Sequence, residues 1–420
     1  MKILVVAPNY PYAARPLPAI FNERSVAVLH GLCEQAQVLV PRPYAPPLFS
    51  SLKPRWKAYS RIPPYELRDG VSVHRPAYLQ VPGIPGRFSI DGGAFLWCRW
   101  AAKQMHRSTG FDAVLSFDLL GAGGIAWKIG RDLAIPVSGW ATGDDVRVKA
   151  SSSQGKAVIR ALNKLDLVFY QSRELLNVAI RSLGISQNRM PEDRHIVLPR
   201  GIPEPPPLAR NEIRKHFREE WKIADSDVLV VSIGRICREK GIYELIKAIT
   251  LSTARNARIR CVIIGSDSAF DDSIAVRQFL RKTPGIDKTV KLLPACSPGR
   301  VWEYLCAADI FAFTSYQEGM PNSPLEAMAM GVPVVAFAIP PILEIDAGTG
   351  AVVLVPPFDP ALFSEALLYL AESRAERARI GEIGRSQVMA RFMVQKNMAC
   401  AVERLASVVL KWSPSQKNCC

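Results

Sequence analysis

The sequence lacks long hydrophobic runs. Its most apolar stretches, DVLVVSIG at 227–234 and PVVAFAIPPIL at 333–343, are broken by charge or proline and stay well below the ~20 residues that cross a bilayer. The first residues, MKILVVAPNYPY, hold one lysine and a short apolar run before a proline-rich turn, which is too short for a signal peptide. A cytoplasmic protein is therefore expected.

Several functional signatures are also missing. No G-x-G-x-x-G follows the first expected strand and no P-loop motif occurs, which argues against a dehydrogenase or a P-loop NTPase. The nine cysteines are scattered without CxxC or zinc spacing, as expected for free thiols in a reducing compartment. The five histidines are equally scattered and are expected to be structural or exposed.

What is present is an alternation of short β-rich runs with amphipathic stretches, and this pattern is typical of parallel α/β units. The 420 residues suffice for two domains of about 200 each. Expected strands lie at 2–8, 37–42, 111–118, 135–140, 165–172 and 195–199, and again at 227–234, 258–265, 289–294, 309–315, 332–337 and 350–355. The fold class is therefore α/β, with two doubly wound, Rossmann-like domains facing an interdomain cleft.

The domain boundaries follow from proline and from the last helical pattern. The first domain is expected at 1–200, a proline-dense hinge at 201–208, and the second domain at 209–395. A final helix at about 396–415 has no strand after it and is expected to pack back on the first domain.

Two glutamates mark the second half, in the segment EGMPNSPLEAMAMGVPVVAF at 318–337. Glu318 follows an apolar strand, at the edge of a parallel sheet where ligands bind, beside Gly319. Glu326 fits a capping box in which Ser323 is the N-cap and Pro324 the first helical residue, so a purely structural role also explains it. The helix start is in addition an anion site, because its first N–H groups are free.

A strand-end loop, SIGRICREKGIYELIKAI at 232–249, supplies cations. Gly234 ends the strand, and Arg235 and Lys240 flank the loop before the next helix. A guanidinium binds phosphate through two parallel hydrogen bonds, and an ammonium adds a compact charge. Two solvated surface cations remain the alternative interpretation.

Together, GRICREKGIYELIKAI and EGMPNSPLEAMAMGVPVVA resemble the donor-binding half of glycosyltransferase family 4, which comprises retaining enzymes of the GT-B fold. The resemblance covers nearly all of residues 228–395, and a looser one through MKILVVAPNYP and IVLPRGI suggests a bacterial surface-polysaccharide or cell-wall glycan transferase. It implies that Arg235 and Lys240 bind the donor diphosphate, that Glu318 holds sugar hydroxyls and that Glu326 accepts from the ribose. The full implied donor set is Gly234, Arg235, Lys240, Glu318, Gly319, Met320, Pro321, Asn322, Ser323 and Glu326, of which Arg235, Lys240 and Glu318 are catalytic.

The resemblance implies no metal and no other cofactor, with the nucleotide sugar as co-substrate, because the cations and the helix start do the work of Mg²⁺. The sequence departs from the family pattern at Thr142, where histidine is common, and at 18–19, 200–201 and 340–341. Acceptor contacts are assigned to Asp144, Asp145 or His106, with solvated or structural roles as their alternatives. Two other functions stay open: a non-hydrolysing nucleotide-sugar epimerase, and a non-catalytic binder of nucleotide sugars or nucleic acid.

The first half is basic. Residues 1–200 carry 26 Lys and Arg against 14 Asp and Glu, whereas residues 201–420 carry 27 against 24. Cations alternate with Trp56, Trp97 and Trp100 in the segments 52–64 and 95–107. That pattern suits an anionic membrane surface and would also suit single-stranded nucleic acid. The family resemblance favours the membrane, at the inner face of the plasma membrane, because acceptors in such pathways are often lipid-linked; nucleic acid is not expected as a partner. Buried tryptophans with solvated cations are the alternative.

Overall fold

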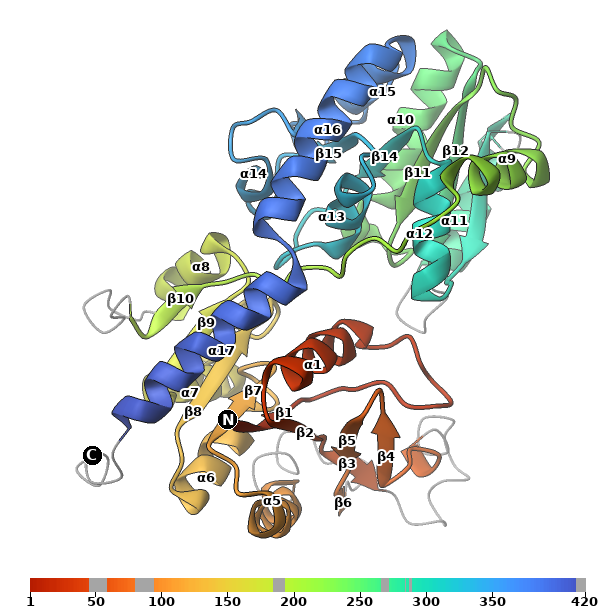
Figure 1. Ribbon diagram of the computed structural model, residues 1–420. Coiled ribbons are helices and arrows are strands. Elements are labelled where there is room, and N and C mark those ends of the chain that lie inside the picture. Colours follow the sequence, from red (N-terminus) through yellow and green to blue (C-terminus); the bar gives the residue numbers. More distant parts are fainter. Residues whose placement is uncertain are drawn as a thin grey trace. The chain divides into compact units, whose positions relative to one another are not determined.

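The computed structural model describes residues 1–44, 59–79, 94–183, 193–265, 272–283, 285–286 and 289–412. The chain consists of two compact units (Figure 1). Unit 1 comprises residues 1–200 together with the segment from Val394 onward, and unit 2 comprises Gly201–Met393. Between Gly201 and Ala209 the chain forms neither helix nor sheet, apart from an isolated bridge between Ile202 and Met393.

Unit 1 is built on an eight-stranded sheet in the order β10-β9-β8-β7-β1-β2-β5-β4. All neighbours are parallel except β4 and β5, which form an antiparallel pair at one edge. The strands are β1 (Lys2–Val6), β2 (Gln35–Leu39), β4 (Tyr65–Arg68), β5 (Val71–His74), β7 (Ala113–Ser116), β8 (Val137–Ala141), β9 (Leu167–Tyr170) and β10 (His195–Val197); β3 (Arg42–Tyr44) and β6 (Ala77–Leu79) form a separate pair.

Helices cover both faces of this sheet because its strands are apolar on both sides. On one face, Leu4 and Val6 of β1 pack in a core with α5 (Phe95–Thr109), α6 (Gly123–Leu133), α7 (Ser153–Lys164) and α8 (Arg173–Leu183). On the other face, Ile3 and Val5 pack in a core with α1 (Ile20–Leu32) and α17 (Val394–Lys411), which contact each other. The last helix therefore lies on unit 1, as Figure 1 also shows.

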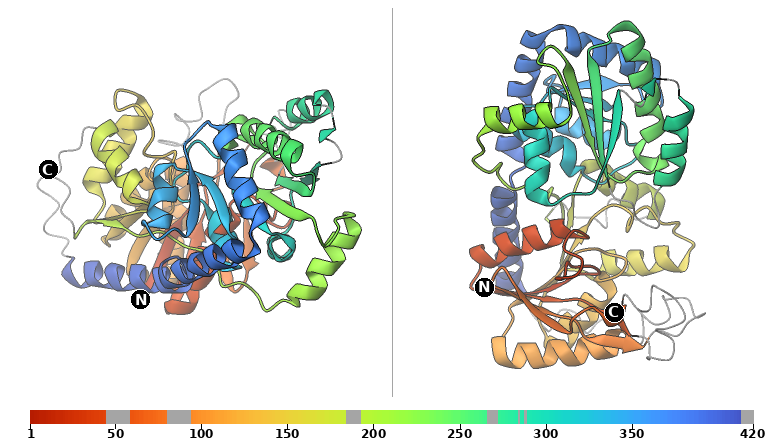
Figure 2. Two further views of the ribbon diagram at one scale, coloured as in Figure 1. Left: turned by 90° about the horizontal axis from the view of Figure 1, so that it is seen from above. Right: turned by 90° about the vertical axis from the view of Figure 1, so that its right-hand side faces the viewer.

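Unit 2 is built on a six-stranded, fully parallel sheet in the order β13-β12-β11-β14-β15-β16. Its strands are β11 (Val228–Ile233), β12 (Ile259–Gly265), β13 (Val290–Pro294), β14 (Ile310–Phe313), β15 (Val334–Phe337) and β16 (Val352–Val355). Its helices are η3 (a 3₁₀ turn, Arg238–Lys240), α9 (Arg210–Glu220), α10 (Ile242–Arg255), α11 (Ser273–Lys282), α12 (Pro298–Ala307), α13 (Asn322–Ala329), α14 (Pro340–Asp346), α15 (Pro360–Glu372) and α16 (Arg374–Arg391). They lie on both sides of the sheet (Figure 2).

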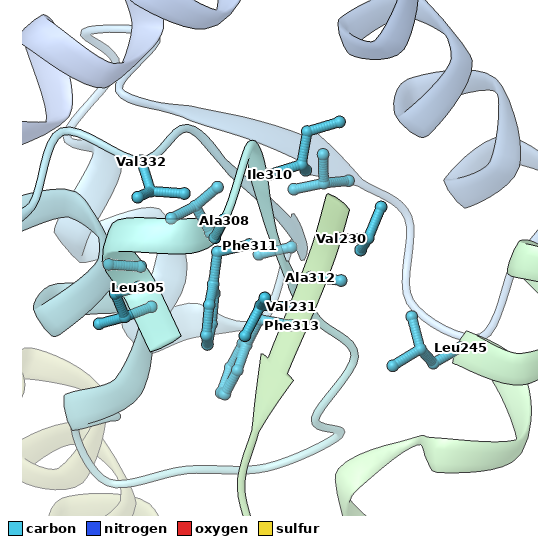
Figure 3. Packing of buried hydrophobic residues seen from close by; sticks show 14 of the residues in the cluster. Val230, Val231, Leu245, Leu305, Ala308, Ile310, Phe311, Ala312, Phe313 and Val332 are labelled. Carbon is cyan, nitrogen blue, oxygen red and sulfur yellow. The ribbon is translucent and has the colours of Figure 1, made fainter. Parts of the chain in front are cut away.

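The core of unit 2 follows the two-residue alternation of its central strands. Phe311 and Phe313 of β14 point toward Leu305 of α12, whereas Ile310 lies on the side of Val230 (Figure 3). The residues of β14 are all buried. The central strands are thereby fixed in register, and the loops at their carboxyl ends start from a rigid base.

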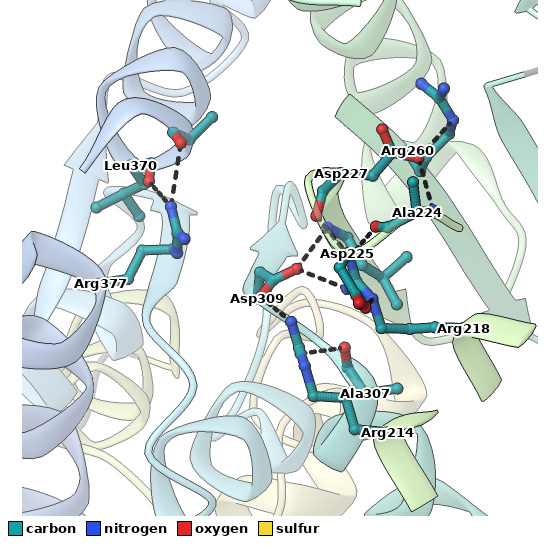
Figure 4. A network of polar contacts seen from close by, with 12 residues as sticks. Arg214, Arg218, Ala224, Asp225, Asp227, Arg260, Ala307, Asp309, Leu370 and Arg377 are labelled. Carbon is teal, nitrogen blue, oxygen red and sulfur yellow. Dashed lines mark hydrogen bonds and ion pairs between the residues drawn. The ribbon is translucent and has the colours of Figure 1, made fainter. Parts of the chain in front are cut away.

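Ion pairs and hydrogen bonds hold the amino ends of β11 and β14 in place (Figure 4). The Asp309 carboxylate, which precedes β14, is paired with Arg214 at 2.6 Å and with Arg218 at 3.2 Å, and it also accepts from the Leu229 N–H. Arg218 in turn donates to the carbonyl of Asp227 at 2.7 Å. This network fastens α9 to the amino ends of the strands, which are opposite to the carboxyl ends where the candidate site lies.

Replacing Asp309 with alanine is expected to lower the free energy of unfolding by about 3 kcal/mol, because the buried guanidinium of Arg218 and the partly buried one of Arg214 lose their carboxylate partner. Urea denaturation of the variant measures this change. Asp225→Ala is the matched control, since that carboxylate is fully exposed at 3.9 Å from Arg218, and it should change stability by less than about 1 kcal/mol. Equal effects of the two substitutions would contradict the assigned role of Asp309.

The fold agrees with the sequence on its main elements. All twelve expected strands are present, and the α/β class with two doubly wound halves is confirmed. The strands β3, β4, β5 and β6 were not expected. The seven cysteines among the described residues are free, whereas Cys419 and Cys420 lie outside them, as do Trp56 and most of the segment 52–64. In the described parts of the chain, no helix combines the length and the apolar character that crossing a bilayer requires.

Candidate functional site

The candidate donor site lies at the carboxyl ends of β11 and β14, where two loops are hydrogen-bonded to each other. The Glu239 carbonyl accepts from the Tyr316 N–H at 3.0 Å, and the Lys240 carbonyl accepts from the Thr314 hydroxyl at 3.0 Å. Thr314 and Tyr316 directly follow β14, whereas Glu239 and Lys240 belong to η3, which follows β11. Residues far apart in the sequence are thus held beside one another.

Gly241 makes this close approach possible. It has a φ of 63°, and a Cβ at this position would lie 1.9 Å from the Thr314 carbonyl oxygen. No side chain fits there without separating the two loops. The glycine is also the N-cap of α10, so Lys240 lies directly before the start of that helix.

Lys240 and Glu318 form an ion pair between the Lys240 Nζ and the Glu318 Oε1. Both side chains are about one-fifth exposed, so the pair is largely shielded and open on one side. The structure thereby unites two residues that the sequence assigned to a donor site. Arg235 lies in the loop after β11 and is half exposed. Its guanidinium lies 3.5 Å from the exposed Glu239 carboxylate. Gly234 before it is exposed.

The helix start beside Glu318 differs from the sequence expectation. Helix α13 begins at Asn322 with Pro321 as its N-cap, and no side-chain cap hydrogen bond is present. The capping box with Ser323 as N-cap is therefore wrong, because the chain turns helical after Pro321, two residues earlier than expected. Asn322 and Ser323 are half-buried, Gly319 is half-buried and Met320 is buried.

Glu326 lies inside α13 and is only 7 % exposed. Its carboxylate is close enough to contribute to the raised pKa of the Cys296 thiol, although burial is the main cause of that shift. Cys296 follows β13, so the loop after β13 approaches Glu326. Sequence analysis did not assign this loop to the site; its place after an apolar strand was the available signal.

In unit 1, the acidic residue Asp118 lies at the carboxyl ends of the strands. Asp118 follows β7, and its Oδ1 accepts from the N–H groups of Gly121 at 2.9 Å and Ala122 at 2.7 Å. Its Oδ2 lies beside Gly121 and accepts no hydrogen bond from the described residues. Burial, and then the neighbouring Asp145 carboxylate, raise the pKa of Asp118 to about 7. Sequence analysis missed this residue, although it is the last residue of the expected strand 111–118.

Asp145 has a backbone role. Its buried carboxylate accepts from the N–H groups of Thr142, Gly143 and Leu119, so it ties the loop after β8 to the loop after β7. Both oxygens of the Asp145 carboxylate take part in these hydrogen bonds. Asp144 beside it is exposed.

His106, the other residue assigned to the acceptor, does not lie at this end of the strands. It lies in the last turn of α5, where its Nδ1 accepts from the Phe111 N–H at 3.0 Å. Phe111 precedes β7, and the next residue, Asp112, is bonded to Lys2 at the start of β1. The histidine therefore lies at the amino edge of the sheet, opposite to Asp118.

Arg200 ends the first segment of unit 1 and lies near Asp118 and Asp145. It is 4 % exposed, donates from Nη1 to Asn22 at 2.6 Å, and lies over the rings of Phe117 and Phe21. Burial lowers its pKa to about 10, against the opposing effects of Asp145 and Asp118. One guanidinium therefore balances part of the negative charge of the two carboxylates.

Comparison with known proteins decides the class of this chain. Residues 213–387 match the family described as glycosyl transferases group 1. These residues are a glycosyl transferases group 1 domain. The chain is a glycosyltransferase, and Arg235, Lys240, Glu318 and Glu326 all lie within the matched domain.

This glycosyltransferase is similar over its length to several known proteins. It is 28 % identical to the putative teichuronic acid biosynthesis glycosyltransferase TuaC of Bacillus subtilis, over 94 % of this chain and 96 % of that one. Sucrose-phosphate synthase from Thermosynechococcus elongatus matches with a TM-score of 0.74 at 16 % identity, over 98 % of this chain and all of that one. HepE of Anabaena, solved in complex with UDP-glucose, matches with a TM-score of 0.69 at 17 % identity, over 97 % and 100 %. The glycosyltransferase therefore has the GT-B fold.

Proposed function

We propose that this glycosyltransferase is a retaining enzyme of family 4 that moves a sugar from a UDP- or GDP-sugar to a glycan acceptor of the bacterial surface. The observation that carries the donor assignment is the Lys240–Glu318 pair, set at the carboxyl edge of a parallel sheet beside the start of α13. The likeness to TuaC, whose name refers to teichuronic acid biosynthesis, supports a polysaccharide product.

The donor diphosphate binds the cations of the loop after β11. Its negative charge competes with Glu318 for the Lys240 ammonium, and the half-exposed Arg235 guanidinium is free to turn from Glu239 toward a phosphate. The first N–H groups of α13 add positive potential at the same edge. These groups stabilise the departing nucleoside diphosphate without a divalent metal.

Once Lys240 turns to the diphosphate, the Glu318 carboxylate accepts from hydroxyls of the donor sugar, which holds the anomeric carbon in place. The bond between that carbon and the β-phosphate oxygen breaks while a bond to the acceptor oxygen forms on the same face. The acceptor hydroxyl proton passes to the phosphate oxygen that leaves. Glu326 accepts from the ribose hydroxyls.

On the acceptor side, we assign the contact to Asp118 of unit 1. Its Oδ1 is held by two N–H groups, whereas Oδ2 remains available to accept from a sugar hydroxyl. A pKa near 7 means that the carboxylate is fully ionised, and accepts most strongly, only above neutral pH. A lipid-linked acceptor is proposed because unit 1 also carries the positive charge of the chain.

Asp118→Asn is expected to stabilise the protein at pH 8 and to slow transfer. Between about pH 4 and pH 7 the folded state binds more protons than the unfolded state, because the folded pKa lies above the ordinary value. The contribution of this group to wild-type stability is therefore greatest in acid and is lost as the pH rises to 7. Thermal unfolding from pH 5 to pH 8 should show the gain of the variant increasing with pH, and a gain independent of pH would contradict the assignment.

A screen of UDP- and GDP-sugars with lipid-linked and free glycan acceptors tests the proposed function, with and without EDTA. We expect transfer that EDTA leaves unchanged, with the same anomeric configuration in donor and product by proton NMR. Loss of transfer in EDTA, or an inverted product, would overturn the metal-independent retaining mechanism. Epimerisation of the sugar nucleotide instead of transfer would revive the alternative that the sequence left open.

A further inference from the structure

One helical layer of unit 1 concentrates the positive charge. Helices α5, α6 and α7 lie side by side on one face of the sheet, with α5 packed on α6 and α6 on α7 (Figure 1). Their residues include eight cations and one acid. The cations are Arg99, Lys103, Arg107, Lys128, Arg131, Lys156, Arg160 and Lys164, and the acid is Asp132, which pairs with Arg99.

Aromatic rings hold some of these cations in the layer. The Lys164 ammonium lies 4.2 Å and the Arg131 guanidinium 5.0 Å from the centre of the Trp127 ring. The Lys128 ammonium lies 4.8 Å from the ring of Phe95. Arg107, Arg131, Lys156 and Arg160 are exposed. The layer is thus an extended basic surface that is almost free of acids.

Large apolar side chains project from the same layer. Leu96, Trp97 and Trp100 of α5 are 61 %, 56 % and 64 % exposed. The opposite face of α5 packs Cys98, Ala102 and Met105 into the core, so the two tryptophans point away from the sheet. Along the exposed stripe, these residues are followed by Gln104 and Arg107. An exposed apolar cluster rimmed by cations marks an interaction site.

We infer that the outer face of α5, α6 and α7 docks on an anionic lipid bilayer, with Leu96, Trp97 and Trp100 inserted at headgroup depth. Tryptophan is amphipathic and prefers this depth, and each basic residue near an anionic surface strengthens binding roughly fivefold. The choice of partner rests on the proposed lipid-linked acceptor. The binding itself needs neither donor nor acceptor, so it can be tested separately from the activity.

The other face of the unit 1 sheet offers a matched comparison. Helices α1 and α17 carry acids as well as bases, with Glu23 beside Arg24 and Glu403 beside Arg404. Leu410 of α17 is 87 % exposed, and Arg404 and Lys411 are cations on the same helix. Substitutions there change the same kinds of side chain without touching the basic layer.

Sedimentation of the full chain with vesicles tests the inference. We expect binding to vesicles of phosphatidylcholine with phosphatidylglycerol and little binding to phosphatidylcholine alone. Binding should weaken strongly between about 0.1 M and about 1 M salt, where the screening length falls from about 10 Å to about 3 Å. Brominated lipids should quench tryptophan fluorescence, because Trp97 and Trp100 lie within the headgroup region.

Two variants of α5 locate the surface. The triple change Leu96→Ser, Trp97→Ser and Trp100→Ser should remove the quenching and weaken binding more than tenfold, and Lys103→Glu with Arg107→Glu should weaken it by a similar factor. Leu410→Ser and Arg404→Glu with Lys411→Glu are the controls and should bind as the wild type does. If the triple variant fails to fold, the charge variant decides.

Three results would overturn the inference. The first is that the chain does not bind anionic vesicles. The second is that vesicle binding weakens equally in the α5 variants and the α17 controls. The third is that the chain binds a single-stranded oligonucleotide but not vesicles. The last result would assign the basic layer to nucleic acid. Absence of transfer in the activity screen would leave the vesicle result intact and would count against the proposed function alone.

Discussion

Lys240→Ala is expected to abolish the thermal stabilisation that UDP, GDP or ADP gives the wild-type protein. The substitution removes the proposed charge-assisted contact to the diphosphate at a shielded site, and such a contact is worth about 2–3 kcal/mol. That energy corresponds to a loss of affinity of roughly 30- to 150-fold. Calorimetric titration with each nucleotide measures the change directly, and the thermal shift gives a second readout.

Lys247→Ala is the matched control for this experiment. Lys247 lies in α10, the helix that follows Lys240, and it is exposed. Its removal takes the same charge from the same unit without touching the paired site, so nucleotide affinity should change by less than about threefold at moderate salt. Similar losses of nucleotide affinity in both variants would mean that Lys240 acts only through the net charge of the unit, and this would contradict a direct contact with the diphosphate.

Glu318→Gln should separate donor binding from transfer. The glutamine keeps the size of the side chain but ends the ion pair, so Lys240 no longer has to leave a carboxylate before it binds phosphate. Nucleoside diphosphates should therefore bind as tightly as before or several-fold more tightly. Transfer should fall by about 10²- to 10³-fold, because the donor sugar loses a charged acceptor that positions its anomeric carbon.

Glu365→Gln is the control for Glu318. Glu365 lies on α15 and pairs with Arg255 at the exposed surface, so both binding and transfer should stay at wild-type levels. A Glu318→Gln variant that binds the nucleotide weakly and transfers in proportion would instead place Glu318 in the diphosphate contact. A variant with normal transfer would exclude Glu318 from the reaction.

The sequence predicts the parallel strands well because a strand buried on both faces is a nearly continuous apolar run between loops. Both halves have such runs, and each was found. The edge pair β4 and β5 was missed because its residues are mixed: Tyr65 and Leu67 are exposed, and Arg68 and His74 lie within the strands. Edge pairing depends on neighbours that are distant in the sequence, and no local pattern encodes it.

The sequence also predicts some residues of the candidate sites and not others, because only some of them belong to a local pattern. Lys240 and Glu318 each follow an apolar strand, so the rule that carboxyl ends of parallel strands share one edge brings them together across 78 residues. Arg200 and Asp118 influence each other electrostatically only because folding brings the loop after β7 near residue 200, and this proximity has no signature in the sequence. The position of His106 at the amino ends of the strands could not be predicted, because its basic surroundings indicate exposure but do not specify an end of the sheet.

A crystal structure of the chain with bound UDP or GDP tests the central claim most directly. The account predicts a diphosphate within hydrogen-bonding distance of Lys240 and Arg235 at the start of α13, with the ribose at Glu326 and the Lys240–Glu318 pair opened. A nucleotide bound elsewhere on the chain, or one bound there with that pair still closed, would contradict it.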